Sequence, residues 1–118
     1  MLDDGKPLFQ QIAEQLSNEI LDGTYPEETA VPSTNELAQF LRINPATAGK
    51  GLNLLVDDGV LYKKRGIGMF VATGARDRLV EARTRAFTHE FIAPMLREAA
   101  KLGISPAQLA DIIQEESA

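Results

Sequence analysis

Apolar residues recur at three- and four-residue steps along most of the chain, and this spacing predicts a mainly helical protein. The first such stripe runs from Phe9 to Ile20. It follows Pro7, which suits the start of a helix, and Gly23 ends it. A short edge strand is expected over residues 29–32, because proline is tolerated at a strand end.

The second helical pattern begins at Ser33. Ser33 and Glu36 have the spacing of a capping box, in which each side chain accepts a hydrogen bond from the other residue's backbone N–H. The helix that follows is expected to turn four apolar residues inward: Leu37, Ala38, Phe40 and Leu41.

A third helix is expected after a turn of about three residues, which matches the dimensions of a helix-turn-helix. Asn44 is a suitable N-cap, and Pro45 fits the first helical position. Lys50 should point away from the inward face, at about 100° of rotation per residue. That inward face is formed by Ala48, Leu52 and Leu55.

A short basic hairpin is predicted after this helix, with strands over residues 60–64 and 69–72. Lys63, Lys64 and Arg65 stand at its tip beside the turn residues Gly66 and Gly68. A helix-turn-helix followed by such a hairpin has the sequence form of a winged helix-turn-helix, whose second helix enters the DNA major groove. The alternative is that the tip carries charge only for solubility.

The C-terminal part predicts a separate helical tail, so we expect a winged helix-turn-helix domain over residues 1–74 and a two-helix unit over 75–118. Pro94 should kink or break the first tail helix near Ile92. Two helices this small cannot bury their apolar stripe alone, so a homodimer is expected. The predicted dimerisation residues are Leu79, Phe87, Phe91, Met95, Leu102, Leu109, Ile112 and Ile113.

The charge distribution modifies this picture. The whole chain carries a net charge of −5, but the segment from Arg42 to Phe70 holds five basic and two acidic residues, which is +3 locally against −8 elsewhere. Repulsion from the acidic remainder is screened within a Debye length of about 8 Å at physiological salt. We therefore expect modest non-specific affinity for nucleic acid, with two subunits binding together.

The composition also limits the kinds of metal site and catalytic site that the chain can form. The 118 residues include no Cys and only one His, which excludes disulfides, thiolate metal sites and a histidine ligand pair. There is no glycine-rich phosphate loop after a strand, so we expect neither an enzyme nor a cofactor or metal. No apolar run approaches the length that spans a bilayer, and a cytoplasmic protein without membrane contact is expected.

Four segments resemble the N-terminal domain of GntR-type bacterial transcriptional regulators, and they stand in the family's order and spacing. They are residues 7–12, 31–38, 44–47 and 64–71. The short helical tail resembles the YtrA-like branch of that family. The resemblance implies a dimeric repressor that binds a double-stranded DNA operator with two-fold symmetry, often one that controls a transporter operon or its own gene.

The resemblance also implies site residues. Ser33 and Thr34 open the first helix of the motif, and Asn35 stands where the family usually has a DNA-contacting arginine. Lys50 replaces the arginine more usual in this branch, and lysine lacks the bidentate fork that recognises guanine. The glycines beside Lys50 are candidates for a close approach of the backbone to phosphate. The predicted DNA-binding residues are Ser33, Thr34, Asn35, Arg42, Asn44, Thr47, Lys50, Lys63, Lys64, Arg65, Gly66 and Gly68.

Three alternatives remain open from the sequence. Arg42 has two interpretations, a phosphate clamp or a cap on the carbonyls of the preceding helix. The acidic total and Asn35 favour a winged-helix protein-interaction module without DNA binding as the second function. Phe87, Phe91 and Met95 are candidates to line an apolar pocket for a small-molecule effector, with core packing as their other use.

Overall fold

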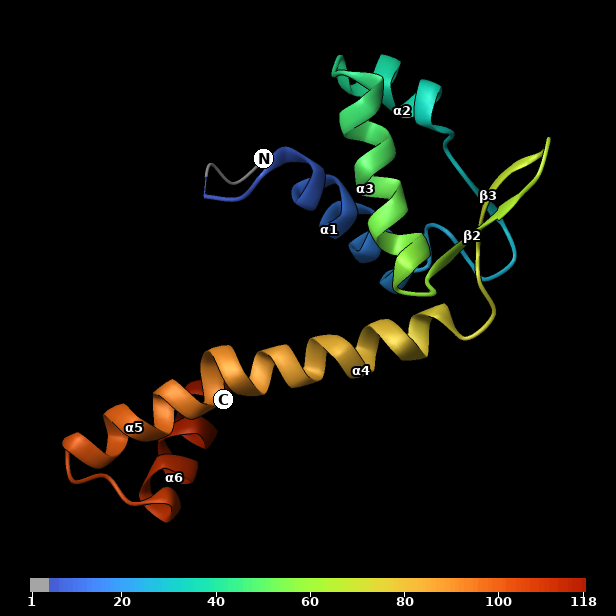
Figure 1. Ribbon diagram of the computed structural model, residues 1–118. Helices are drawn as coiled ribbons and strands as arrows, with labels where there is room; N and C mark the ends of the chain where they lie inside the picture. The colour runs from blue at the N-terminus through green and yellow to red at the C-terminus, as the bar shows by residue number, and fades with distance from the viewer. Residues whose placement is uncertain (1–4) are drawn as a thin grey trace. The chain divides into compact units, whose positions relative to one another are not determined.

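The computed structural model describes residues 5–118 and divides the chain into two compact units, Met1–Val80 and Glu81–Ala118. Helices predominate, together with one small sheet (Figure 1), which confirms the predicted fold class. The elements are α1 (Leu8–Leu21), β1 (Ala30–Val31), α2 (Thr34–Leu41), α3 (Pro45–Asp57), β2 (Leu61–Lys64), β3 (Gly68–Val71), α4 (Ala75–Phe87), the π-helical turn η1 (Thr88–Ile92), α5 (Ala93–Lys101) and α6 (Pro106–Ser117).

The core of the first unit lies where α1, α2 and α3 meet the small sheet. The inward face predicted for α3 is confirmed, because Ala48 and Leu52 are fully buried and Leu55 is nearly so. Burying a leucine side chain such as that of Leu52 contributes roughly 1.5–3 kcal/mol relative to leaving it exposed. The largest fully buried side chains are Ile20, Leu52, Leu61, Val60 and Val71.

The three strands form an antiparallel sheet in the order β1-β3-β2. Strand β1 pairs Ala30 with Phe70, which confirms the predicted edge strand, and β2 pairs Tyr62 with the same Phe70. The hairpin turns at Gly66, whose φ of 77° lies in the left-handed region that favours glycine. The sheet thus forms the wing beside the three helices.

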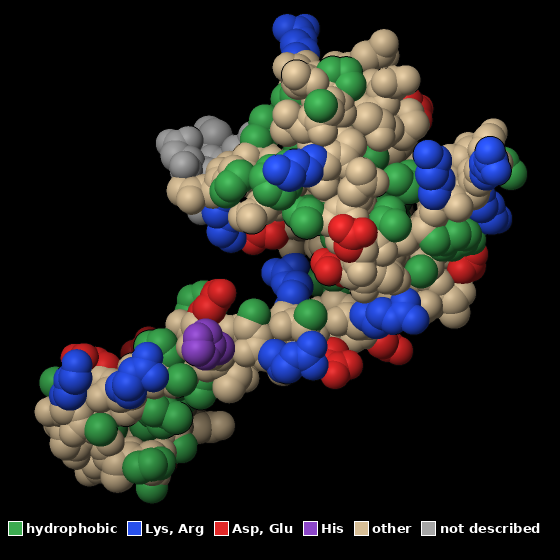
Figure 2. Space-filling view, in the orientation of Figure 1, with side chains coloured by type: hydrophobic (Ala, Val, Ile, Leu, Met, Phe, Trp, Pro, Cys, Tyr) green, Lys and Arg blue, Asp and Glu red, His purple; other side chains and the backbone are tan. Residues whose placement is uncertain are grey.

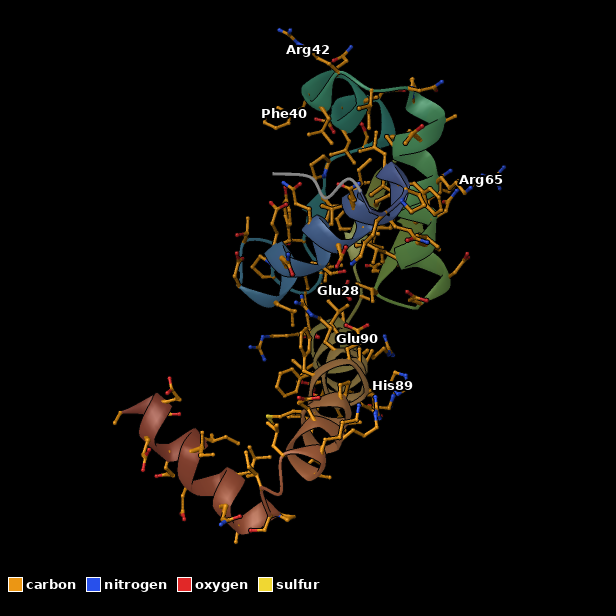
Figure 3. All side chains as sticks on the ribbon, turned by 90° about the vertical axis from the view of Figure 1, so that its left-hand side faces the viewer. Glu28, Phe40, Arg42, Arg65, His89 and Glu90 are labelled. Carbon is orange, nitrogen blue, oxygen red and sulfur yellow. The ribbon has the colours of Figure 1, made fainter. Side chains whose placement is uncertain are left out.

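The capping box of α2 is confirmed, but one of its inward residues is not. Ser33 Oγ accepts a hydrogen bond from the Glu36 N–H at 3.1 Å, and Glu36 Oε1 accepts one from the Ser33 N–H at 2.9 Å. Phe40 was expected to face inward, yet it is 85% exposed, with its ring outside the ribbon in Figure 3. Phe40 is only about 60° around the helix from buried Leu37, so its exposure comes from how α2 packs on the domain and not from helical periodicity.

Gly51, one of the two glycines beside Lys50, has a packing role that differs from the predicted approach to phosphate. A Cβ at Gly51 would lie 2.9 Å from the backbone oxygen of Phe9 and 3.0 Å from Ile12 Cγ2. Gly51 is also buried, so it serves the close packing of α3 on α1 and not an approach to phosphate. Gly49 differs, because a Cβ there would meet Thr34 Cγ2 at an ordinary 3.5 Å.

Helix α4 begins within the first unit. Ala75 and Leu79 belong to that unit's hydrophobic core, and Arg78 Nη1 donates to the Gly59 carbonyl oxygen at 2.8 Å. Leu79 is only 8% exposed, which corrects its assignment to the dimerisation surface, because its side chain is already covered within the protomer. The two compact units meet at Val80 and Glu81, inside α4.

The second unit contains the rest of α4, η1, α5 and α6. Pro94 has no N–H to continue the helical ladder, and the Ala93 N–H bonds to the Thr88 oxygen five residues back. This π-helical turn lies where a kink or break near Ile92 is predicted, and the helical run continues through it into α5. Ser105 caps α6, with Gln108 completing a second capping box. Ala99 is buried in this unit, at 6% exposure.

Candidate nucleic-acid interface

Helix α3 presents polar side chains near its N-terminus. Asn44 Oδ1 accepts a hydrogen bond from the Ala46 N–H at 2.8 Å, which confirms its role as N-cap. Thr47 is half-buried, and Lys50 is exposed as predicted. The Asn44 side chain is therefore engaged in capping through its Oδ1, while Lys50 provides the exposed cation of this helix.

Lys50 does not extend freely into solvent. Its Nζ lies 4.1 Å from the centroid of the Phe9 ring, which is cation–π distance. Phe9 belongs to α1, and the sequence analysis placed it only in the apolar stripe of that helix. No periodicity pairs residues this far apart, since the contact exists only because α1 packs against α3.

The wing carries the remaining cations. Lys63, Lys64 and Arg65 are exposed, and the Lys64 Nζ lies 4.4 Å from the centroid of the Phe70 ring. Figure 2 shows basic side chains gathered over this hairpin, and Figure 3 places Arg65 on the same side of the unit as α3. Ile67 at the tip is 73% exposed. The wing and α3 thus both carry exposed basic side chains, and Arg65 of the wing lies on the same side of the first unit as α3.

The base of the wing is held by Glu28, which the sequence analysis passed over. Its carboxylate accepts hydrogen bonds from the Tyr62 hydroxyl and, at 2.6 Å, from the Thr73 hydroxyl. These bonds, from Thr73 first and then Tyr62, hold the pKa of Glu28 below its usual range. The backbone of Glu28 has a φ of 64°, a conformation that its sequence context does not signal. Figure 3 labels this residue.

The predicted contacts from α2 and its turn occupy different environments. Ser33 Oγ is engaged in the capping box, whereas Asn35 is exposed. Thr34 lies beside Gly49 of α3, at 3.5 Å from the Cβ that Gly49 lacks. The Thr34 side chain therefore lies at the junction of the two motif helices.

Arg42 ends α2 in the left-handed conformation, with a φ of 56°. The backbone N–H groups of Arg42 and Ile43 bond the last carbonyls of the helix, and the Arg42 side chain is exposed, pointing away from the domain in Figure 3. The backbone thus supplies the C-cap, which leaves the guanidinium available for a phosphate.

The second unit exposes large apolar side chains. Phe87 is 52% exposed and Phe91 60%, and their ring centroids lie 5.6 Å apart. Met95 and Leu109 are half-buried. Leu102, Ile112 and Ile113 are also exposed.

A separate apolar pocket of about 250 Å³ lies within the first unit, against α1 and α2. Phe40, Tyr25 and Leu37 are among the residues that line it. None of the three predicted effector residues belongs to this pocket.

Within residues 5–118, no three His, Asp or Glu side chains gather closely enough to hold a metal ion. Over the same described range, every helix is too short or too polar to cross a bilayer.

Comparison with known proteins identifies the class of protein to which this fold belongs. The model of the family "Bacterial regulatory proteins, gntR family" matches residues 8–71. The chain therefore belongs to the GntR family of transcriptional regulators, and its winged helix-turn-helix is the domain that defines the match. The expectation that the chain is not an enzyme agrees with this membership.

Individual relatives extend the comparison. The chain is 29% identical over 112 residues to the HTH-type transcriptional repressor YtrA of Bacillus subtilis, which covers 95% of this chain and 85% of YtrA. A GntR-family regulator from Bacteroides thetaiotaomicron superposes with a TM-score of 0.80 at 34% identity, over 92% of this chain and 95% of that structure. The DNA-binding domain of AraR in complex with operator ORR3 superposes with a TM-score of 0.54 at 35% identity, over 56% of this chain and 80% of that one.

Proposed function

We propose that the protein is a sequence-specific DNA-binding repressor that acts as a homodimer on an operator with two-fold symmetry. The observation that carries the proposal is that Lys50 of α3 and Lys63, Lys64 and Arg65 of the wing are exposed cations of one unit. In a winged helix-turn-helix, these are the elements that enter the major groove and contact the adjacent backbone. The AraR domain, which is similar over this part of the chain, has been solved bound to its operator.

The side chains divide between reading bases and contacting phosphates. Asn44, Thr47 and Lys50 are proposed to face base edges, since they lie in the N-terminal half of the recognition helix. Phosphate contacts are assigned to polar and charged groups of α2, of its two caps and of the wing, which fix register without carrying sequence information. These residues are Ser33, Thr34, Asn35, Arg42, Lys63, Lys64 and Arg65, with the backbone at Gly66 and Gly68.

The dimer is proposed to form through the second unit. Its exposed phenylalanines and isoleucines would otherwise remain in water, and burying them against a second copy is favourable in proportion to the apolar area covered. The recognition helices must then reach half-sites about 34 Å apart, or a multiple of that distance. The proposed interface consists of Phe87, Phe91, Met95, Leu102, Leu109, Ile112 and Ile113.

The regulated genes are proposed to be a transporter operon or the protein's own operon, and the protein is proposed to act in the cytoplasm, where bacterial operators lie.

A small-molecule effector is proposed to act at Phe87, Phe91 and Met95 by changing the spacing of the recognition helices. Thermal-shift screening against a broad panel of metabolites tests this site. A shift that is lost in Phe91→Ala supports it, and no shift from any compound counts against it.

A gel-shift titration with duplex DNA from the region upstream of the protein's own gene tests the main proposal. Binding should weaken steeply with salt, with a slope near −0.9 for each phosphate neutralised. Lys50→Ala combined with Arg65→Ala should abolish binding. The matched control is Arg97→Ala combined with Lys101→Ala, which removes two exposed cations from the second unit and should leave binding nearly unchanged. Equal binding by both double variants would refute the mechanism.

The second candidate function, a winged-helix interaction module without DNA binding, is favoured by the exposed side chains of Phe40 and Ile67 on the first unit. Pull-down with and without nuclease separates the two functions. Retention of a protein partner that survives nuclease, with no DNA retained, would favour the module.

A further inference from the structure

The contact between Lys50 and Phe9 joins the recognition helix to the first helix of the domain. The Lys50 ammonium lies over the face of the ring, 4.1 Å from its centroid, and Lys50 remains exposed. A lysine carries its charge on a flexible four-carbon stem with three N–H donors. Stacking on a ring restricts the stem and still leaves donors directed to solvent.

The position of the ring is set by core packing. Phe9 is half-buried in the first turn of α1, and its backbone oxygen would lie 2.9 Å from a Cβ on Gly51, the residue next to Lys50. Ile12, one turn later in α1, is buried against the same glycine. The close approach of the two helices therefore brings the Phe9 ring beneath the side chain that precedes Gly51.

The wing repeats this arrangement with different residues. The Lys64 ammonium lies 4.4 Å from the centroid of the Phe70 ring, and Phe70 is half-buried in β3. Two lysines of the basic surface, on two separate elements, thus each lie over a ring that is anchored in the fold.

We propose that Phe9 is a positioning residue for DNA recognition, which holds the Lys50 ammonium in place before DNA arrives. This inference rests on the proposed DNA-binding function. Ordering a long side chain at an interface has a free-energy cost, and a side chain that is already restricted pays less of it. Without the ring, Lys50 has to be ordered by DNA alone, and the dissociation constant rises about three- to tenfold.

Phe9→Leu tests the proposal, because leucine keeps an apolar side chain in α1 and removes the ring. DNA affinity should fall about three- to tenfold, while the salt dependence stays unchanged because the number of cations is the same. Phe40→Leu is the matched control, since it removes an equally large ring that is 85% exposed and is not part of the Lys50–Phe9 contact. It should leave affinity unchanged.

A double-mutant cycle separates positioning from a purely structural role. In a Lys50→Met background, which keeps the stem and removes the charge, Phe9→Leu should cause no further loss of affinity. The same loss in both backgrounds would overturn the proposal, as would unchanged or tighter binding by Phe9→Leu. Thermal unfolding of each variant establishes that it is folded.

A measurement without DNA distinguishes failure of this inference from failure of the proposed function. In the free protein, the ring should shift the NMR signals of the Lys50 ε-methylene protons upfield, and Phe9→Leu should abolish that shift. If Lys50 shows no ring-dependent shift, the inference is wrong even where the protein binds DNA. If the shift is present but the wild-type protein binds no DNA, it is the proposed function that fails, and the positioning role fails with it.

Discussion

Gly51→Ala is the substitution whose outcome the structure constrains most sharply. The added Cβ would lie 2.9 Å from the Phe9 backbone oxygen, 3.0 Å from Ile12 Cγ2 and 3.2 Å from Ile12 Cβ. The nearest of these is a backbone atom of another helix, which cannot rotate away as the end of a flexible side chain can. Helix α3 must therefore move away from α1, which loosens the core contact between them.

The sign of the effect follows from two opposing magnitudes. Alanine is favoured over glycine within a helix by about 1 kcal/mol, which stabilises any such variant. Inserting a methyl group into a packed interface costs typically about 1–3 kcal/mol. Gly49→Ala in the same helix has the same gain without the clash, because its Cβ would meet Thr34 Cγ2 at 3.5 Å. The difference between the two variants isolates the packing cost, about 1–3 kcal/mol.

Urea denaturation of the wild-type protein and both variants measures this difference. We expect Gly49→Ala to have a higher denaturation midpoint than the wild-type protein. The midpoint of Gly51→Ala should be lower than that of Gly49→Ala, with m-values unchanged in both variants. Equal stability of the two variants would refute the packing argument. It would show that the helices separate at no cost, and Gly51 would then have no structural reason to be glycine.

Two further predictions concern exposed residues. Phe40→Ser should change the free energy of unfolding by no more than about 0.5 kcal/mol, because the side chain is 85% exposed. Leu37→Ser should destabilise the protein strongly, because Leu37 is only 8% exposed. Urea titration checks both variants, and a large loss of stability in Phe40→Ser would contradict the observed orientation of Phe40. Glu28→Gln should flatten the loss of stability in acid. The Glu28 pKa is lower in the folded protein, so its contribution is present above the unfolded value of about 4.5 and is lost as pH falls through the folded pKa. Thermal melts at a series of pH values test this, and identical acid profiles for the two proteins would exclude the Glu28 bonds as a source of stability.

Much of the first unit could be predicted because its signals are local. The cap at Asn44 and the capping box at Ser33 depend on residues at most three apart, and both are present. The inward face of α3 follows from helical periodicity, and the hairpin from glycines beside the basic tip. These features need only the geometry of one element, so the order of residues is sufficient to place them.

The positions that were misjudged depend on how elements meet. Phe40 has an apolar side chain, but only the packing of α2 shows that the core has no place for it. Leu79 fits the apolar pattern of the tail, yet its side chain is covered by the first unit. The apolar character of a side chain indicates that its burial is favourable, but it does not indicate which surface will bury that side chain.

The sequence by itself therefore determined the helices, the hairpin, the caps and the basic side chains of α3 and the wing, since each arises from neighbouring residues. Only the tertiary structure decided that Gly51 lets α3 lie against α1, that Glu28 bonds to Thr73 at the base of the wing, and that the Lys50 ammonium lies over the Phe9 ring. The physical reason is that these contacts join residues from separate elements. Their distances are set by the packing of the whole domain, which no local pattern encodes.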